Sequence, residues 1–420
     1  MTKKSDAPAI RFKGFSDAWE QRKLASLCEK FTDGDWIESK DQSDFGVRLV
    51  QTGNVGVAEY LDKTNNKKWI SEDTFDRLHC EEVLPGDILI SRLPEPAGRA
   101  CIVPLLGTKM ITAVDCTIVR TAPDMSNKFL VQYLSSQAYF DDVNTCLAGG
   151  TRQRISRGNL ANFNVPIPVK KSEQDAIGMF FGYLDNLITL HQRKFEKLTN
   201  VKKSMLEKMF PQNGSSYPEI RFKGFTDPWE QRKLGDMMNV TSVKRIHQSD
   251  WTDSGVRFLR ARDIVAAAKN EEPDDYLYIS KEKYEEYSTL SGKVGVSDLL
   301  VTGVGTIGVP YLVRNLEPLY FKDGNIIWFQ NSDKIDGKFL FYSFSAEQIQ
   351  GFINESAGIG TVGTYTIESG KKTPISLPNQ IEQAKVGEFF QQLDNLITLH
   401  QRELEKLQNI KKSMLEKMFV

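Results

Sequence analysis

The chain has 420 residues, of which 40% are hydrophobic and 26% charged, and its net charge at pH 7 is -1. This composition is typical of a globular protein of two to four domains, and no apolar run has the length of a membrane span. The near-neutral charge neither favours nor excludes a nucleic-acid partner, because a basic patch can lie on one face of a neutral protein. The first residues lack the apolar segment of a signal peptide, and the five cysteines form no CxxC pair. We therefore expect a cytoplasmic protein with free thiols and no contact with a membrane.

The chain begins with a leader that occurs again halfway along it. Ile10–Leu24 reads IRFKGFSDAWEQRKL and Ile220–Leu234 reads IRFKGFTDPWEQRKL, identical at 13 of 15 positions. A repeat at this spacing indicates duplication of a half-chain rather than a solenoid. Aromatic residues spaced three or four apart in the leaders favour packing against helices or a partner over contact with DNA: Phe12, Phe15, Trp19, Phe222, Phe225 and Trp229.

The segments that follow the two leaders have diverged. Short β-rich runs between Gly, Pro and Asn turns predict strands, and helical pieces lie between them, so each segment is expected to form a mixed α/β globule of about 150 residues. The strands expected in the first copy are Val47–Gln51, Ile88–Ser91, Ala100–Pro104 and Thr117–Arg120. The helical pieces are expected within Asn127–Cys146 and, in the second copy, Asp336–Asn354.

Each half ends in a long segment without proline. Glu173–Phe210 and Glu382–Phe419 are identical at 28 of 38 positions. Their apolar residues follow a seven-residue period, which predicts two coiled-coil helices of ~57 Å each. These helices are too polar to span a membrane. The residues expected to pack between helices or against a partner are Phe181, Leu184, Ile188, His191, Leu198, Phe390, Leu393, Ile397, His400 and Leu407.

The two halves predict an α/β protein with pseudo-two-fold symmetry, in which two globules are separated by two long antiparallel helices. Because His191 and His400 are equivalent and near the middle of each helix, we expect them to meet near the pseudo-axis and to set the register. Gly214–Pro218 is expected to be an exposed linker. The expected domains are residues 1–172 (leader and first globule), 173–211 (helix), 212–381 (leader and second globule) and 382–420 (helix).

Signatures of catalysis are missing from the sequence. Gly303–Gly308 matches GxGxxG, but a strand rather than a helix is expected after it, so a hairpin turn is the better interpretation. Gly358–Gly363 follows a helical stretch and also lacks the context of a dinucleotide site. No P-loop, HExxH or Asn-Pro-Pro-aromatic string is present, and four histidines form no triad or metal signature. We expect no metal, no cofactor and no catalysis in this chain.

The order of these motifs resembles the specificity (S) subunit of type I restriction-modification systems. The resemblance covers nearly the whole chain and is carried by the two leaders, the repeated helices and three strings of the first globule. These strings are VRxxxxxN (Val47, Arg48 and Asn54), GDILIS (Gly86–Ser91) and GTRQRIS (Gly150–Ser156). The second globule departs from the pattern, with Val-Ser-Asp at Val296–Asp298 and AGIGTVGTYTI in place of AGGTRQRI.

The resemblance implies that each globule is a target recognition domain for one half of a bipartite DNA sequence. The long helices would space these domains and dock two methyltransferase (M) subunits, and restriction (R) subunits would join for ATP-driven translocation and cleavage. S-adenosylmethionine, ATP and Mg would then be bound by the partner subunits. An alternative from another class is a coiled-coil scaffold whose globules bind protein. A stand-alone enzyme is disfavoured by the missing motifs.

Basic and polar residues in loops are the candidates for contact with double-stranded DNA. Arg and Gln can bind guanine and adenine edges in pairs of hydrogen bonds, whereas Ser and Thr suit phosphates. The strongest group surrounds the Arg-rich loop near residue 150, although a solvated basic loop is the plain alternative. The candidates are Arg48, Gln51, Asn54, Lys67, Lys68, Thr151, Arg152, Gln153, Arg154 and Arg157 in the first half, and Lys244, Arg245, Arg257, Arg260, Arg262, Thr364, Tyr365, Lys371 and Lys372 in the second.

Overall fold

The computed structural model divides the chain into two compact units, and each unit takes a part of both long helices. Unit 1 comprises Met1–His191 and Glu403–Val420, and unit 2 comprises Gln192–Arg402. The structure describes residues 7–148, 153–212, 214–273, 275–331, 333–357 and 363–419. These units cut the long helices near their middles, whereas the sequence-based domain boundaries set each helix apart as a segment of its own.

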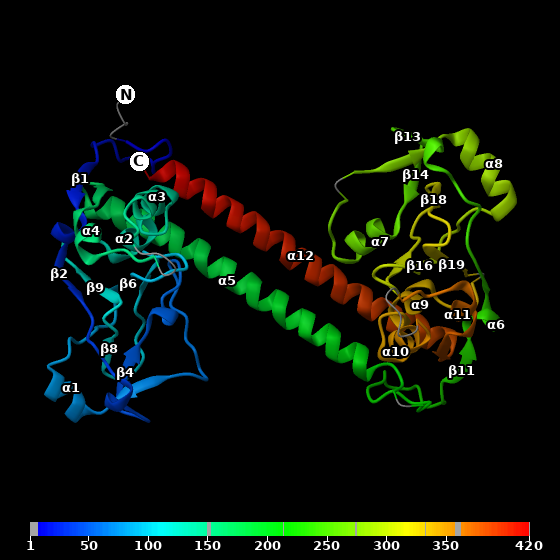
Figure 1. Cartoon of the computed structure of the whole chain (residues 1–420), viewed down its shortest axis with the longest axis horizontal. Coiled ribbons are helices and arrows are strands. Elements are labelled where there is room, and N and C mark those ends of the chain that lie inside the picture. Colours follow the sequence, from blue (N-terminus) through cyan, green and yellow to red (C-terminus); the bar gives the residue numbers. More distant parts are fainter. Residues whose placement is uncertain are drawn as a thin grey trace. The chain divides into compact units, whose positions relative to one another are not determined.

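In the described part of unit 1, the strands form three small sheets with orders β1-β10, β2-β9-β6-β7 and β3-β5-β4-β8. Several of these strands are labelled in Figure 1. The strands are β1 (Glu20–Lys23), β2 (Cys28–Asp33), β3 (Gln42–Ser43), β4 (Val47–Val50), β5 (Lys68–Ile70), β6 (Ile88–Ser91), β7 (Ala100–Ile102), β8 (Met110–Thr112), β9 (Cys116–Thr121) and β10 (Asn164–Ile167). The short helices are η1 (Leu24–Leu27), η2 (Ser39–Asp41), η3 (Thr52–Asn54), α1 (Glu72–Leu78), α2 (Asn127–Tyr133), α3 (Gln137–Thr145) and α4 (Arg157–Asn162).

Unit 2 repeats this topology, with strand orders β11-β20, β12-β19-β16-β17 and β13-β15-β14-β18. The strands are β11 (Glu230–Lys233), β12 (Asn239–Thr241), β13 (Trp251–Thr252), β14 (Val256–Leu259), β15 (Leu277–Ile279), β16 (Leu299–Thr302), β17 (Pro310–Leu312), β18 (Leu319–Phe321), β19 (Ile326–Gln330) and β20 (Pro374–Leu377). The short helices are α6 (Leu234–Met237), η4 (Gln248–Asp250), α7 (Ala261–Ala268), α8 (Lys281–Ser291), α9 (Gly337–Ser343), α10 (Glu347–Ser356) and α11 (Ile367–Lys372). The prediction of two mixed α/β globules related by duplication is confirmed.

Several local predictions are confirmed and one is refined. Ile88–Ser91 is a strand with the expected bounds. The glycine-rich string after β16 is a hairpin turn, because β16 pairs antiparallel with β17 and places Val301 opposite Pro310. The helical stretch expected within Asn127–Cys146 is two helices, because Ser136 caps the second by accepting a hydrogen bond from the backbone NH of Tyr139. The corresponding stretch of unit 2 is likewise divided, into α9 and α10.

The long helices α5 (Lys171–Lys208) and α12 (Gln380–Met418) each carry a Glu-Gln pair in the first turn, and this pair is repeated in both. Glu173 receives two hydrogen bonds from Arg11 of the first leader, at 2.6 and 2.7 Å, and its side chain is 2% exposed. Gln174 accepts from the backbone NH of Ser126 and donates to the carbonyl of Pro168. The equivalent pair in unit 2, formed by Glu382 with Arg221, has distances of 2.7 and 2.8 Å. The leader and the start of each long helix are therefore joined by a buried ion pair.

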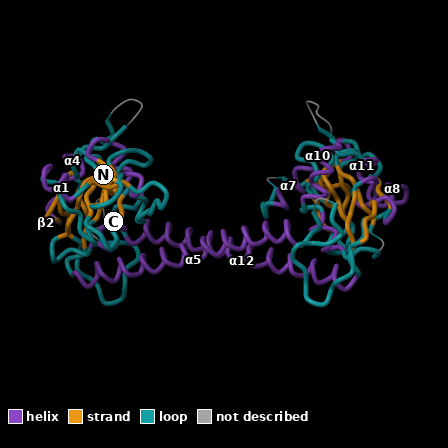
Figure 2. Tube along the Cα trace, turned by 90° about the horizontal axis from the view of Figure 1, so that it is seen from below, coloured by secondary structure: helices purple, strands orange, loops and turns teal. Residues whose placement is uncertain are grey.

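Segments of α5 and α12 lie side by side and antiparallel within each unit (Figures 1 and 2). In unit 1 the ring of Phe419 stacks on that of Phe181 with centroids 5.9 Å apart, and Lys411 forms an ion pair with Asp185 at 2.5 Å. The distant end of the sequence thus completes the core around Phe129.

Unit 2 repeats the arrangement with the helices exchanged. Phe210 stacks on Phe390 at 5.9 Å, and Lys202 pairs with Asp394 at 2.6 Å. Each residue of these pairs is the repeat equivalent of one in unit 1. Six of the residues expected to pack between helices lie in or against the core of their own unit: Phe181, Leu184 and Leu407 in unit 1, and Leu198, Phe390 and Leu393 in unit 2. Ile397 is 9% exposed and Ile188 is half-buried. The meeting of His191 with His400 stays a prediction.

The leader aromatics pack as predicted. Phe12 and Phe222 lie edge-on to Phe180 and Phe389, with centroids 5.9 and 6.1 Å apart. Trp19 is 5% exposed in the core of unit 1, and its equivalent in unit 2 is 2% exposed. All five cysteines are free thiols. In the part of the chain that the structure describes, no helix combines the length and the apolar character that crossing a bilayer requires.

Candidate nucleic-acid interface

The first group of predicted contacts, at the end of β4, is largely internal. Arg48 is 2% exposed, donates to the carbonyl of Lys68 at 3.0 Å and lies 5.4 Å from the ring centre of Trp69. Asn54 is 4% exposed and caps η3 by accepting from the backbone NH of Gln51, so its amide is used within the fold. Because Arg48 and Asn54 are buried, they offer no surface to DNA. Their prediction as DNA contacts is wrong, and both have structural roles.

The lysines that follow occupy a turn and the start of a strand. Lys67 is exposed in the turn before β5, and its ammonium lies 3.8 Å from the carboxylate of Asp62. Lys68 is half-buried on β5 itself. Lys67 therefore remains a candidate for a phosphate contact. Gln51, another residue of the predicted set, is half-buried.

The residues that flank the Arg-rich stretch of unit 1 are joined by a pair of backbone hydrogen bonds. Ala148 and Arg154, on either side of this stretch, exchange NH and carbonyl at 3.1 and 2.9 Å. Thr151 and Arg152 lie outside the described residues. Gln153 is exposed, and the guanidinium of Arg154, 60% exposed, lies 3.8 Å from Asp115.

Arg157 opens α4 next to this loop. Ser156 caps the helix by accepting a hydrogen bond from the backbone NH of Asn159, and this cap fixes Arg157 as the first residue of α4. The Arg157 side chain is 47% exposed and its Nε lies 3.8 Å from Asp33. Ion pairs of this exposure contribute little to stability, so the guanidinium can exchange its carboxylate for a phosphate at small cost.

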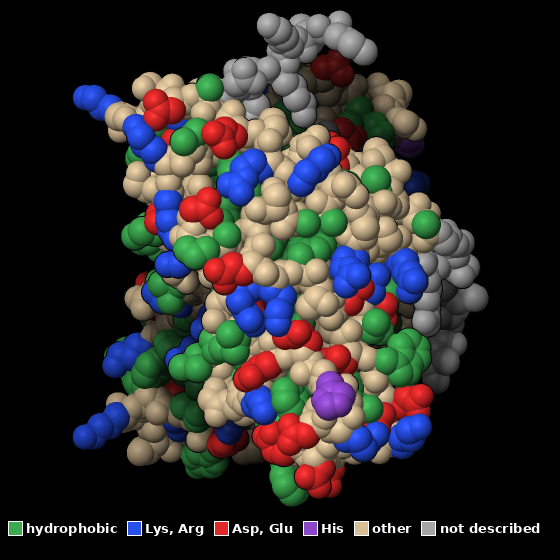
Figure 3. Space-filling view, turned by 90° about the vertical axis from the view of Figure 1, so that its left-hand side faces the viewer, with side chains coloured by type: hydrophobic (Ala, Val, Ile, Leu, Met, Phe, Trp, Pro, Cys, Tyr) green, Lys and Arg blue, Asp and Glu red, His purple; other side chains and the backbone are tan. Residues whose placement is uncertain are grey.

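One end face of unit 1 carries side chains of both charges (Figure 3). Lys and Arg side chains alternate with Asp and Glu over that face, with hydrophobic side chains scattered between them. A uniform basic surface would bind any DNA through its phosphates. This face of unit 1 is not uniformly basic.

The unit 2 counterpart of the Arg-rich loop differs in chemistry. Thr364 is exposed, but Tyr365 is 2% exposed, and its hydroxyl lies 2.5 Å from that of Thr373. Burial also raises the pKa of the Tyr365 phenol. Tyr365 is therefore a core residue, and its assignment as a DNA contact is corrected. Lys371 and Lys372 are exposed at the end of α11, where Lys371 pairs with Glu368 at 2.7 Å.

The remaining basic residues of unit 2 are partly gathered around one hollow of 620 Å³. Arg245, Arg260 and Arg262 line it, together with His247 and Lys322. Lys322 is missing from the sequence-based set because it lies in another segment, directly after β18. The pairing of β18 with β14 brings it here, since Phe321 is opposite Leu259.

Lys244 and Arg257, the other two of these basic residues, lie outside the hollow. Lys244 is exposed, and its ammonium lies 5.2 Å from the ring centre of Tyr287. Arg257 is half-buried with its guanidinium 3.8 Å from the ring centre of Tyr276, a stacking arrangement that fixes it within the fold.

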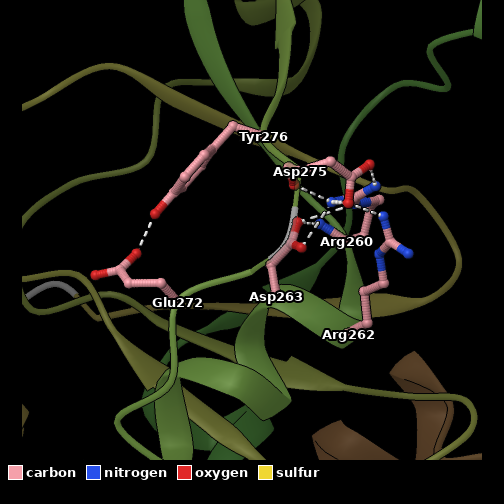
Figure 4. Close-up of polar contacts among 6 residues, drawn as sticks. All are labelled: Arg260, Arg262, Asp263, Glu272, Asp275 and Tyr276. Carbon is pink, nitrogen blue, oxygen red and sulfur yellow. Dashed lines mark hydrogen bonds and ion pairs between the residues drawn. The ribbon is translucent and has the colours of Figure 1, made fainter. Parts of the chain in front are cut away.

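A network of carboxylates supports the arginines of the hollow (Figure 4). Arg260 donates through Nε and Nη2 to Asp263, at 3.1 and 2.9 Å, and through Nη1 to Asp275 at 2.9 Å. Asp275 also accepts from Nη2 of Arg262. Hydrogen bonding to Arg260 holds the pKa of Asp275 below its ordinary value, so this carboxylate stays charged at neutral pH.

Two equivalent grooves lie beside the long helices, one in each unit. The unit 1 groove, of 600 Å³, is lined by Asp185, Asn186, Ile188 and Thr189 of α5. The unit 2 groove, of 840 Å³, is lined by the repeat equivalents of these residues, Asp394, Asn395, Ile397 and Thr398 of α12. The opposite walls come from the diverged globules, with Val57–Tyr60 in unit 1 and Ala267–Asn270 in unit 2.

The two units share one topology and a repeated pair of long helices, but they expose different polar side chains. This arrangement defines a duplicated recognition protein. Comparison with known proteins identifies its class. A family model described as type I restriction modification DNA specificity domain matches residues 16–200 and again residues 226–409. The chain therefore belongs to this family and carries the domain twice.

Individual relatives agree with this assignment. The chain is 27% identical over 270 residues to the type I restriction enzyme MjaVIII specificity subunit of Methanocaldococcus jannaschii, an alignment that covers 60% of each protein. It is 21% identical over 420 residues to a protein of the same organism provisionally named the MjaX specificity subunit, covering 94% of this chain and 92% of that one. The S subunit of a type I restriction-modification system from M. genitalium has the same fold, with a TM-score of 0.66, 14% identity and 99% of both chains covered. The resemblance to specificity subunits is confirmed.

Proposed function

We propose that this chain recognises a bipartite DNA sequence, one half with each unit, and directs methylation and restriction by partner subunits. The observation that carries the proposal is the contrast between the repeated leaders and long helices and the diverged loops of the globules. The leaders are identical at 13 of 15 positions and the long helical segments at 28 of 38, whereas the exposed loops differ. A common mount that presents two different polar surfaces suits a protein that must recognise two different sequences.

The residues proposed to contact DNA are the exposed members of the predicted set. Side chains at the surface can exchange a weak intramolecular ion pair for phosphate or base contacts, whereas buried ones cannot without disturbing the core. The set in unit 1 is Lys67, Gln153, Arg154 and Arg157, and in unit 2 it is Lys244, Arg245, Arg262, Thr364, Lys371 and Lys372.

The partners that suit this role are two methyltransferase subunits and restriction subunits. The two equivalent grooves support a pair of identical partners, because the helix residues that line them are repeated in both units. Leu190 and Leu399 are also equivalent, they are 46% and 52% exposed, and each directly follows a groove-lining threonine in the chain. S-adenosylmethionine, ATP and Mg would be held by the partners, and this chain would take no catalytic part. Such a complex would act in the cytoplasm of a bacterium or archaeon.

Base-resolved methylation sequencing tests the proposal. DNA from cells that express this chain together with its methyltransferase is compared with DNA from cells that express the methyltransferase alone. We expect a two-part adenine-methylated motif that appears only when this chain is present. An unchanged pattern of methylation, in cells where the complex is shown to assemble, would contradict the proposal and favour a protein-binding scaffold.

A further inference from the structure

The hollow of unit 2 has a chemistry that its counterpart in unit 1 lacks. Strand register defines the equivalence. Gln42 and Val47 both lie opposite Ile70 in unit 1, just as Trp251 and Val256 both lie opposite Ile279 in unit 2. The parallel pairs agree, because Val50 faces Thr112 as Leu259 faces Phe321.

Following the chain from these paired residues gives the equivalents of the five basic residues. Trp36, Glu38, Gln51, Gly53 and Ala113 of unit 1 stand where unit 2 has Arg245, His247, Arg260, Arg262 and Lys322. The matching 3-10 turns support this alignment. Glu38 and His247 each precede such a turn, and the third residue of the turn, Asp41 or Asp250, caps it in the same way. Unit 1 therefore has no Lys, Arg or His at any of these five positions.

The two exposed arginines of the hollow differ from Arg260 in their surroundings. Arg260 is 16% exposed, and its Nε, Nη1 and Nη2 all donate to Asp263 or Asp275, so it acts as a support. Arg262 is 60% exposed on the first turn of α7 and projects toward Asp275 (Figure 4). Arg245 is 67% exposed with its Nε 3.5 Å from Asp323.

A guanidinium that is held on one side by a carboxylate keeps a second edge of N–H donors for another partner. Guanine presents two acceptors, O6 and N7, side by side in the major groove, and Arg is the side chain that matches them with two hydrogen bonds. The hollow also suits a phosphate, which accepts from Arg in the same way but carries no sequence information. We favour guanine, because Asp275 accepts from both Arg260 and Arg262 and so helps to fix the direction of the remaining donors of Arg262.

We propose that the hollow of unit 2 recognises guanine in the half-site bound by this unit, with Arg262 as the base-contacting side chain and Asp275 as its positioning residue. This inference rests on the proposed function. It adds that the two half-sites are recognised by different chemistry, since unit 1 offers no cation at the equivalent positions.

The test is the methylation motif of cells that express the methyltransferase with variants of the full chain. Arg262→Ala is expected to make one guanine position of one half-site degenerate, with discrimination there falling roughly ten- to a hundredfold, and to leave the other half-site unchanged. Arg262→Lys keeps the charge but loses the two-donor edge, so it is expected to relax the same position. Asp275→Asn is expected to relax that position too, although less than Arg262→Ala. Lys281→Ala, which removes an exposed cation of unit 2 outside the hollow, is the matched control.

The outcomes separate the possible roles. Uniformly weaker methylation with an unchanged motif would make Arg262 a phosphate contact and overturn the inference, as would a motif that no variant alters. Failure of the unaltered chain to direct any two-part motif would instead remove the proposed function itself. Should Arg262→Ala not assemble with the methyltransferase, Arg262→Lys decides the question, because it keeps the charge and nearly the same length of side chain.

Discussion

At the scale of single residues, the ion pair between leader and long helix is the contact whose loss should be felt most. Glu173 is buried and Arg11 supplies two short hydrogen bonds to it. Removing one partner of such a pair leaves a charge without compensation in a site from which water is excluded. We expect Arg11→Ala to lower the free energy of unfolding of unit 1 by about 3 kcal/mol.

Hydrogen exchange followed by mass spectrometry can measure this loss for each unit separately. Protection should fall in the peptides around β1, β10 and the start of α5, whereas unit 2 stays as it was. The matched control is Arg221→Ala, which removes the equivalent partner of Glu382 and should reverse the pattern. Equal loss of protection in both units from either variant would contradict the expectation.

The sequence predicts the positions of these residues but not their partnership. The repeat shows that Arg11 and Glu173 both recur, yet 162 residues separate them, and no local pattern connects a leader with a helix start. Tyr365 shows the reverse case. It belongs to a loop-like stretch of polar residues, but it lies next to exposed Thr364 with its own side chain turned into the core. Which of two neighbours is buried depends on tertiary packing, which composition does not reveal.

At the scale of elements, two glycines in α5 offer a matched pair of substitutions. A Cβ on Gly178 would lie 2.7 Å from the Cβ of Lys128 and from the backbone N of Phe129, so α2 can approach α5 closely only at a glycine. A Cβ on Gly182, one turn later, would meet nothing within 4 Å. Alanine has the higher helix propensity by about 1 kcal/mol, and this gain is available only where there is space.

We therefore expect opposite effects from the two alanine variants. Gly178→Ala should lower the melting temperature of unit 1 because α2 must move, whereas Gly182→Ala should raise it slightly. Differential scanning calorimetry of the full chain measures both. A stabilising Gly178→Ala variant would show that the helices have room that the structure does not give them.

The ends of the long helices are the second feature at this scale. Phe419 lies against Phe181, Trp19, Phe129 and Tyr133, with ring centroids between 5.4 and 6.4 Å away. Phe419→Ala should cost about 3 to 5 kcal/mol, as for other large aromatic residues removed from a core. Limited proteolysis should then cut unit 1 first. Phe210→Ala, which removes the equivalent ring from unit 2, is the control and should direct the first cuts there instead.

At the scale of the whole molecule, the duplication and the antiparallel helices are predictable from the sequence, because the repeats are long and nearly identical. The division into units is not. A boundary drawn from sequence follows the chain, so it assigns residues 403–419 to the last helix, whereas the structure packs their apolar side chains into the core of the first globule. The repeated ending KKSMLEKMF indicates that both helix ends have the same packing role, but it does not show which core each end packs into.

This exchange of helix ends predicts how the protein should respond to a cut between its halves. Gly214 is exposed in the turn that joins the first long helix to the second leader, so a protease site inserted there should be accessible. Cleavage separates Phe210 from most of unit 2 and Phe419 from most of unit 1, yet both rings remain in the cores that they complete. We expect the two fragments to stay associated in size-exclusion chromatography under native conditions. The double variant Phe210→Ala and Phe419→Ala should come apart after the same cleavage at a lower concentration of urea, since each lost ring removes about 3 kcal/mol or more from the association. Separation of the unaltered fragments in buffer alone would show that the helix ends contribute little to holding the halves together.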